Sequence, residues 1–153
     1  MKRKPDSIRT GFTLIELVLV VVMLAILASI AIPRVGWSTM VKVQAETAAR
    51  QFYDYLKLAR SLAITHADSN GEGYEVVLSS SQPYTYSLVN SDTAEVVKGP
   101  LALPEGVGYS GDRTYQFTPL GNLSGGTQLS VQFSKSGETS TVTVTPVGRI
   151  TLQ

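Results

Sequence analysis

The sequence has no cysteine, a single histidine and few charges, and each shortage narrows the classes of function. Without cysteine the chain forms no disulfide, so its folded part relies on a hydrophobic core. Charged residues make up 16% of 153 and the net charge is +1, which does not indicate a nucleic-acid-binding protein. A Ser-His-Asp set that uses His66 and Asp68 stays open, but no serine lies in a nucleophile-elbow motif. The sequence therefore predicts a protein that is not an enzyme, has no catalytic residue and needs no cofactor.

One long apolar run dominates the chain. Residues 12–32 contain a single charge, Glu16, and as a helix they would extend about 31 Å, enough to cross the hydrocarbon of a bilayer. A carboxylate inside such a segment is costly unless it is paired, so Glu16 indicates a functional partner. Residues 1–11 carry four basic side chains against Asp6, a net charge of +3. This positive-inside signal predicts a single-pass protein with a cytoplasmic N-terminus and an exported C-terminal domain.

Two simpler interpretations of the run are open. An ordinary secretory signal could be cleaved after Ser29-Ile30-Ala31, but its apolar core would be 7 to 15 residues long. A simple single-span anchor would need no carboxylate. Neither interpretation explains why Gly11 is followed directly by Phe12 and then by Glu16.

The N-terminal motif closely resembles that of type IV prepilins and type II secretion pseudopilins. The residues that carry the resemblance are Lys2 to Lys4 (KRK) and Gly11 to Leu17 (GFTLIEL). It implies that a prepilin peptidase and methyltransferase of the inner membrane cuts between Gly11 and Phe12 and methylates the new N-terminal Phe12. It also implies that Glu16 pairs with the N-terminal amine of a neighbouring subunit and sets the register of assembly.

The same resemblance implies where the protein acts and with what. Residues 1–11 would be a leader peptide, and residues 12–32 a helix that contacts membrane lipid before it enters the core of a filament. The remaining domain would lie in the periplasm and then in the pseudopilus. The partners would be other pilins or pseudopilins.

The apolar pattern of residues 33–66 predicts an amphipathic continuation of the same helix. Pro33 would kink this helix rather than end it, because a helical apolar pattern resumes after the proline. Glu46, Arg50 and Asp54 lie four residues apart on the polar side. The apolar stripe steps by three and four residues through Val41, Ala45, Ala48, Phe52, Leu56, Ala59 and Ala63.

Residues 67–153 predict an antiparallel β domain. Turn residues follow the helix, and apolar side chains then alternate as in half-buried strands. Together with the helix, this predicts an α+β, pilin-like fold with six or seven strands. The expected strands are 74–79, 84–90, 93–98, 115–118, 127–134, 139–145 and 148–152, with an irregular stretch at 100–109.

Within that family, the domain is most similar to the GspH/FimT group. The similar segments are Leu58 to Ile64, Tyr115 to Gly121 and Gly148 to Ile150. This similarity implies a minor pseudopilin of a type II secretion system, the H subunit, near the tip of the pseudopilus. The alternative is a minor type IV pilin that binds DNA during uptake.

The sequence does not favour the DNA-binding alternative. DNA-binding members commonly carry a second arginine two places after the first, where this chain has Thr151. From Gly71 onward, four cations meet seven carboxylates, so no electrostatic footprint for phosphate is evident. If DNA did bind, Arg113 and Arg149 would be the contact residues.

Two further patterns resemble binding loops but are better explained as turns. Asp68, Asn70 and Glu72 alternate like the start of a calcium loop, but Ser79 stands where that loop needs its bidentate glutamate. Asx turns explain the same residues, so no metal site is predicted. Residues 121–126 (GNLSGG) lack the Lys-Ser/Thr pair and the helix that a phosphate loop requires.

Overall fold

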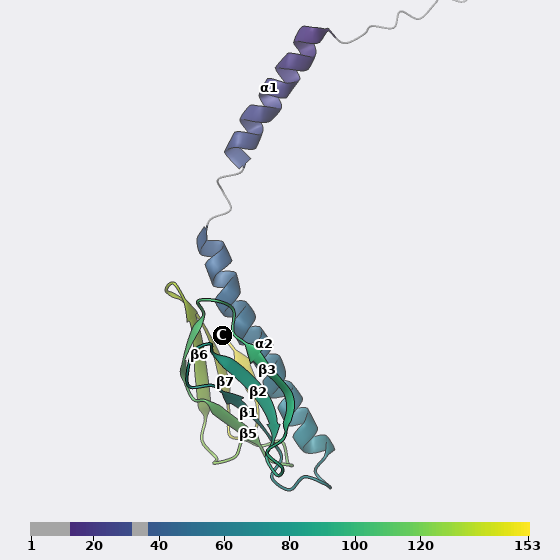
Figure 1. The fold of residues 1–153 in the computed structure, drawn as a ribbon, viewed down its shortest axis with the longest axis vertical. Coiled ribbons are helices and arrows are strands. Elements are labelled where there is room, and N and C mark those ends of the chain that lie inside the picture. The colour runs from purple at the N-terminus through teal and green to yellow at the C-terminus, as the bar shows by residue number, and fades with distance from the viewer. Residues whose placement is uncertain (1–12, 32–36) are drawn as a thin grey trace, which may run out of the picture. The chain divides into compact units, whose positions relative to one another are not determined.

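The structure is a computed structural model that describes residues 13–31 and 37–153. Its two compact units are Met1–Trp37 and Ser38–Gln153. The first unit holds helix α1, and the second holds helix α2 beyond Trp37 together with all the described strands (Figure 1).

Helix α1 spans Leu14–Ala31. Its sequence has no glycine or proline, the residues least favourable inside a helix, and is rich in leucine and alanine. The carbonyl of Thr13 accepts the first hydrogen bonds, from the N–H groups of Glu16 (3.1 Å) and Leu17 (3.2 Å). Among the described residues, no helix combines the length and the apolar character that a membrane crossing requires.

Helix α2 spans Trp37–Thr65 and carries the predicted stripe. Six stripe residues are 0–1% exposed: Ala45, Ala48, Phe52, Leu56, Ala59 and Ala63. On the opposite side, Arg50 and Glu46 form an exposed ion pair of 2.7 Å across one helical turn. The amphipathic prediction is therefore confirmed. The predicted continuity of the helix through Pro33 lies at 32–36, outside the described residues.

Two four-stranded antiparallel sheets make up the rest of the second unit. The first has the order β3-β2-β1-β5 and the second has the order β4-β6-β7-β8. The strands are β1 (Tyr74–Leu78), β2 (Thr85–Asn90), β3 (Val96–Ala102), β4 (Gly108–Gly111), β5 (Thr114–Phe117), β6 (Leu129–Lys135), β7 (Glu138–Val144) and β8 (Ile150–Leu152). The α+β prediction is confirmed, with one or two more strands than expected.

Two expectations about the strands were wrong. Strand β3 begins at Val96 rather than at residue 93, because the Asn90 side chain accepts the Asp92 N–H and the Asn90 carbonyl accepts the Ala94 N–H in a turn. It then continues through Pro100, which a strand at the edge of a sheet tolerates because a missing N–H there need not remove a ladder bond. Strand β4 begins within the stretch 100–109 that was predicted to be irregular, and its two glycines hide the alternation.

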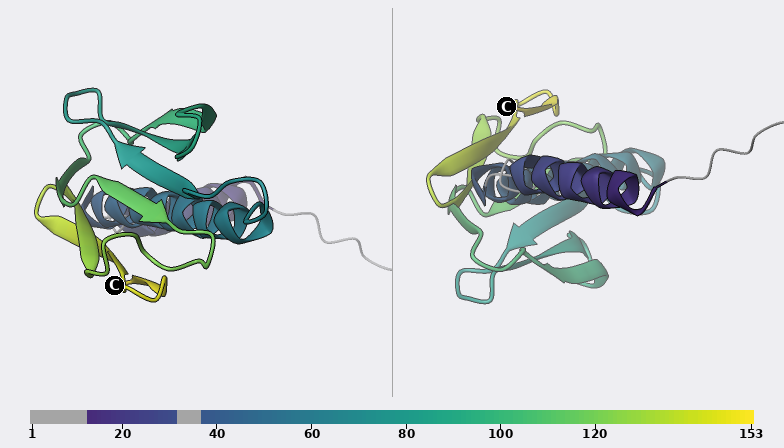
Figure 2. Two further views of the ribbon diagram at one scale, coloured as in Figure 1. Left: turned by 90° about the horizontal axis from the view of Figure 1, so that it is seen from below. Right: turned by 90° about the horizontal axis from the view of Figure 1, so that it is seen from above.

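The core lies where α2 packs against both sheets. The ring of Phe52 lies 5.4 Å from that of Tyr86 and 5.5 Å from that of Tyr115, both in the first sheet. It also lies 5.4 Å from the ring of Phe133 in the second sheet. Figure 2 shows strands β2 and β3, in teal and green, on one flank of α2, and the yellow strand β8 on the other. One helix therefore holds the two sheets together.

Candidate functional site

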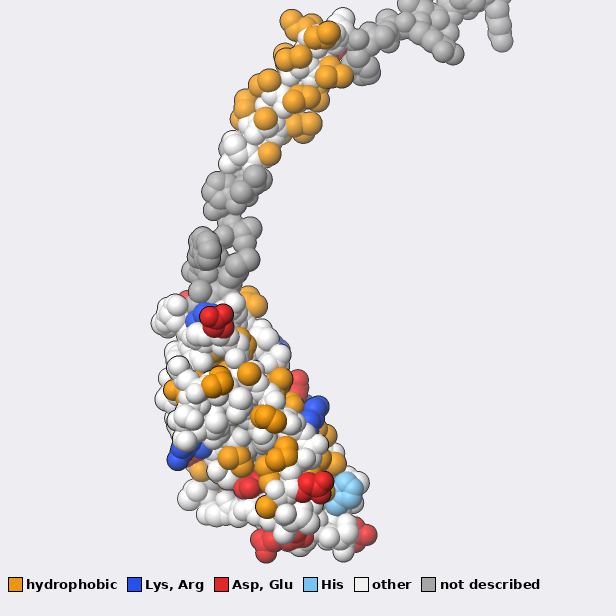
Figure 3. All heavy atoms as spheres, viewed as in Figure 1, with side chains coloured by type: hydrophobic (Ala, Val, Ile, Leu, Met, Phe, Trp, Pro, Cys, Tyr) orange, Lys and Arg blue, Asp and Glu red, His pale blue; other side chains and the backbone are white. Residues whose placement is uncertain are grey.

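Helix α1 presents apolar side chains to its surroundings on every side. Its large apolar residues from Leu14 to Leu27 are each 50–82% exposed. They cover the visible face of the helix in Figure 3. A helix that is apolar all round is stable only when it is buried in protein or in lipid. The apolar surface of α1 therefore requires one of these two surroundings.

Glu16 and Thr13 form a capping box at the start of α1. The Thr13 N–H and the Thr13 hydroxyl each donate to Glu16 Oε2 at 3.4 Å. In return, the Glu16 N–H donates to Thr13 Oγ1 at 3.3 Å. The Thr13 N–H, which lies before the first helical turn, is thereby satisfied, and the Glu16 N–H gains an acceptor besides the Thr13 carbonyl. This role was not among the predictions from the sequence, although Thr-x-x-Glu before an apolar run is its usual signature.

The predicted processing residues, Gly11 and Phe12, lie outside the described residues. Cleavage between them and methylation of Phe12 therefore remain predictions.

A basic groove lies between α2 and the loop that joins β7 to β8. It encloses about 620 Å³, and Lys57, Arg60, Ile64, Val147 and Arg149 contribute to its walls. The lining has three cations and no carboxylate.

Two of the cations are held by contacts within the domain. The Arg60 Nε–H donates to the carbonyl of Gly121 at 2.9 Å, and the Lys57 ammonium lies 4.9 Å from the centre of the Tyr53 ring. Neither contact neutralises a charge. Within the described part of the chain, the ion pair between Arg50 and Glu46 uses neither of these cations nor Arg149.

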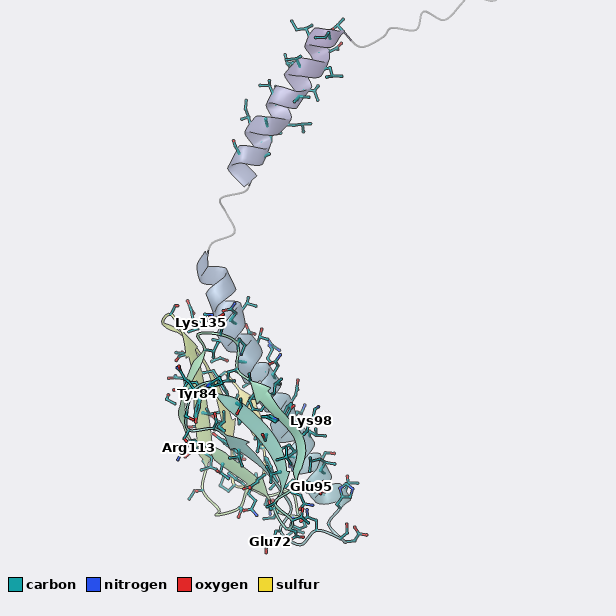
Figure 4. All side chains as sticks on the ribbon, viewed as in Figure 1. Glu72, Tyr84, Glu95, Lys98, Arg113 and Lys135 are labelled. Atoms are coloured by element: carbon teal, nitrogen blue, oxygen red, sulfur yellow. The ribbon has the colours of Figure 1, made fainter. Side chains whose placement is uncertain are left out.

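The structure does not bring Arg113 and Arg149 together. Arg113 directly precedes β5, whereas Gly121, which touches Arg60 and Gly148 at the groove, follows that strand. Arg113 does not line the groove that contains Arg149. Figure 4 labels Arg113 beside the strands of the domain. The missed partners of Arg149 are Lys57 and Arg60, which occupy one side of α2 three residues apart.

Two tyrosines of the first sheet, Tyr86 and Tyr115, are buried and offer no exposed ring for stacking on a base. Tyr86 is 1% exposed and Tyr115 is 0% exposed, as expected for strand residues with one face in the core. Burial raises the pKa of both hydroxyls well above the ordinary value. Among the described residues, neither hydroxyl has a hydrogen-bond partner. These two rings are part of the hydrophobic core, where both pack against Phe52.

The residues around His66 and Asn70 build a turn. The buried Asn70 side chain accepts the Gly73 N–H at 2.6 Å and donates to the Gly73 carbonyl at 2.8 Å. It also donates to the side chain of Asn90 at 2.9 Å. The His66 Nδ1 lies 3.2 Å from the Leu62 carbonyl. Among the described residues, no three His, Cys, Asp or Glu side chains gather in a way that could hold a metal ion.

Two crystal structures of the type IV minor pilin FimU from Pseudomonas aeruginosa, strain PAO1, are similar to this chain. One has a TM-score of 0.56 at 16% identity and covers 71% of this chain and 87% of its own. The other has a TM-score of 0.54 at 17% identity, with coverage of 70% and 90%. Likeness at this identity concerns the fold, so the chain has a pilin-like α+β fold. No protein-family model and no curated protein matches the sequence.

Proposed function

We propose that the chain is a subunit of a type IV pilus or of the related pseudopilus of type II secretion. The observation that carries this proposal is an apolar helix, exposed on all sides, on a chain whose folded domain is pilin-like. The whole apolar run, residues 12–32, is suited to two apolar surroundings in turn. It would lie in membrane lipid in the monomer and among the helices of neighbouring subunits in a filament, where van der Waals packing replaces contact with lipid.

The proposed maturation begins at the leader. The basic residues before Gly11 hold the N-terminus in the cytoplasm, and the folded domain passes to the periplasm. A prepilin peptidase then cuts between Gly11 and Phe12, and Phe12 is methylated. The new amine on Phe12 would carry a positive charge four residues before Glu16, the one carboxylate of α1.

The capping box supports a role for Glu16 in assembly. Both hydrogen bonds from Thr13 use Oε2, so Oε1 is available to a further donor. The amine of a neighbour's Phe12 would supply an opposite charge, and pairing removes most of the cost of a carboxylate in apolar surroundings. The capping interaction would hold the carboxylate at the start of the helix, where that amine would arrive.

Our first choice between the two systems is a minor pseudopilin of type II secretion, near the tip of the pseudopilus. The GspH-like segments support it. The rival is a minor type IV pilin that binds DNA during uptake. The groove that joins Arg149 to Lys57 and Arg60 supports that rival.

Complementation tests the choice. The gene would be expressed in one strain that lacks the minor pseudopilin H and in another that lacks a minor type IV pilin of the uptake type. We expect protein secretion to be restored in the first strain. Restoration of DNA uptake alone would assign the chain to the rival system, and failure in both strains would count against a filament role. A Gly11→Leu variant, which blocks cleavage, is the control in each strain.

A further inference from the structure

Strand β8 leaves one edge of the second sheet open. It is the last strand in the order β4-β6-β7-β8, so among the described residues no strand pairs with its outer edge. Thr141 and Gln153 exchange both backbone hydrogen bonds, at 2.8 and 2.9 Å. Because hydrogen-bonded pairs alternate along an antiparallel ladder, Thr151 also bonds to β7. The N–H and C=O groups of Ile150 and Leu152 therefore point to the open edge.

The open edge of β8 borders the basic groove. Ile150, at the start of β8, lines this groove together with Lys57 and Arg60 of α2. A second hollow, of about 310 Å³, lies between Leu152 at the end of β8 and Arg50 of α2. Figure 2 shows β8, in yellow, alongside α2. The unpaired backbone groups of β8 therefore lie beside open space at both ends of the strand.

The side chains of the groove restrict the kind of segment that can pair with β8. Lys57, Arg60 and Arg149 contribute positive charge, and the described lining includes no carboxylate. The groove also displays apolar surface, because Ile64 is 49% exposed and Val147 is 67% exposed. A segment that pairs with β8 must therefore bring carboxylates near the start of this strand, and at least one apolar side chain.

We propose that an extended, acidic segment of a different filament subunit adds to the open edge of β8 as a further strand of the second sheet. Its backbone pairs with Ile150 and Leu152, and its carboxylates meet Lys57 and Arg149. In strand addition of this kind, main-chain hydrogen bonds give affinity and pockets for alternate side chains give specificity. The inference rests on the proposed function and deepens it, because it gives a minor subunit a site for a partner that is not a copy of itself.

The groove suits a peptide better than nucleic acid. Phosphates would satisfy the cations, but nucleic acid has no row of amide groups that could pair with an open strand. The described lining also contains no aromatic ring on which a base could stack. The exposed side chains of Ile64 and Val147 gain nothing from a phosphate backbone, whereas an apolar side chain of a peptide would cover them.

A synthetic peptide tests whether β8 accepts a strand. The probe is a fluorescein-labelled peptide in which valine and threonine alternate and glutamates occupy one end. One control peptide carries lysines in place of the glutamates. Another control is methylated on alternate backbone nitrogens, which removes N–H groups that an added strand needs. We expect the full-length chain in detergent to bind the probe several-fold more tightly than either control, as measured by fluorescence anisotropy.

Variants of the chain then locate the binding. Leu152→Pro removes an N–H at the open edge but no ladder bond to β7, whereas Leu152→Ala shortens the same side chain and keeps the N–H. Leu152→Pro should therefore weaken binding several-fold more than Leu152→Ala. Arg149→Glu should reverse the preference, so that the lysine peptide binds better than the probe. In the wild type, amide hydrogen exchange should show that the probe protects the N–H groups of Ile150 and Leu152.

Several outcomes would overturn the inference. Equal binding of the methylated peptide, or no protection of Ile150 and Leu152, would show that charge alone attracts the probe. A labelled DNA duplex that binds where the probe does not would assign the groove to nucleic acid. A dimer of the chain that Leu152→Pro dissociates, but Leu152→Ala does not, would assign β8 to a second copy. Cleavage after Gly11 by a prepilin peptidase is scored on the same chain, so absent binding with normal cleavage rejects strand addition but not the filament role.

Discussion

At the scale of single residues, close packing of the backbone decides which amino acid a position can hold. Gly148 shows this most clearly. Its φ is +76°, and a Cβ there would lie 1.9 Å from the carbonyl oxygen of Gly121 and 2.9 Å from Arg60 Nε. The loop that carries Arg149 can therefore approach α2 only because residue 148 has no side chain.

We predict that Gly148→Ala destabilises the domain more than Gly125→Ala does, and that Gly148→Ala alone disturbs the groove. Gly125 also has a positive φ, +85°, but a Cβ there meets nothing within 4 Å. Gly125→Ala should therefore cost only the backbone strain, about 1 kcal/mol, and Gly148→Ala should cost clearly more. Urea unfolding of the full chain in detergent measures both. Equal losses in the two variants would show that the contact with Gly121 is unimportant.

The buried hydroxyl of Tyr115 gives a second prediction. This hydroxyl has no partner, so Tyr115→Phe removes an unsatisfied polar group and should stabilise the domain by about 1 kcal/mol at neutral pH. The raised pKa adds a dependence on pH. Because the folded state holds the proton more tightly, the wild type is fully stabilised below about pH 10 and loses stability above it, as the unfolded chain ionises first.

Tyr115→Phe should therefore lose less stability than the wild type between neutral pH and about pH 11. Unfolding curves at several pH values measure this difference. Tyr84→Phe, at a half-buried position, is the control and should follow the wild type. A Tyr115→Phe variant that is less stable at neutral pH would show that the hydroxyl has a partner after all.

At the scale of elements, hydrophobic periodicity predicted the helices and most strands because each has one clear pattern. The stripe of α2 and the alternation of β6 and β7 reappear as buried faces. Strands β3 and β4 were missed or misplaced because neither alternates: β3 is exposed throughout, and β4 contains two glycines. Whether such a segment forms a strand depends on its pairing at the edge of a sheet, and that pairing is set by the rest of the fold.

The start of α1 carries a prediction that separates two roles of Glu16. Glu16→Ala should leave cleavage after Gly11 intact and prevent assembly, because it removes both the cap and the carboxylate that meets a neighbour's amine. Thr13→Ala removes the capping hydroxyl alone and should weaken the helix start by about 1 kcal/mol, with assembly largely retained. Sheared filament fractions and whole-cell fractions, probed for the mature chain, measure both effects.

Glu46→Ala is the matched control, because it removes an exposed carboxylate from α2 whose ion pair with Arg50 is worth little. Normal incorporation of Glu16→Ala into filaments would contradict the pairing mechanism. An equal loss in Thr13→Ala and Glu16→Ala would mean that capping, rather than pairing, is what assembly needs.

At the scale of the whole molecule, the groove is the feature that could not be predicted from the sequence. Arg149 was recognised as a candidate contact, but its neighbours Lys57 and Arg60 come from a helix far earlier in the chain. Only the packing of α2 against the loop after β7 brings them together. The processing motif is the opposite case, because it is local and can be identified from seven consecutive residues.

The central claim is that this is a processed filament subunit, and the N-terminus of the mature protein tests it most directly. The full chain would be produced together with a prepilin peptidase, and its N-terminal peptide would be identified by mass spectrometry. The account predicts a chain that begins at N-methylated Phe12. A chain that still begins at Met1, or one cut after Ala31 as an ordinary secretory signal would be, would contradict it.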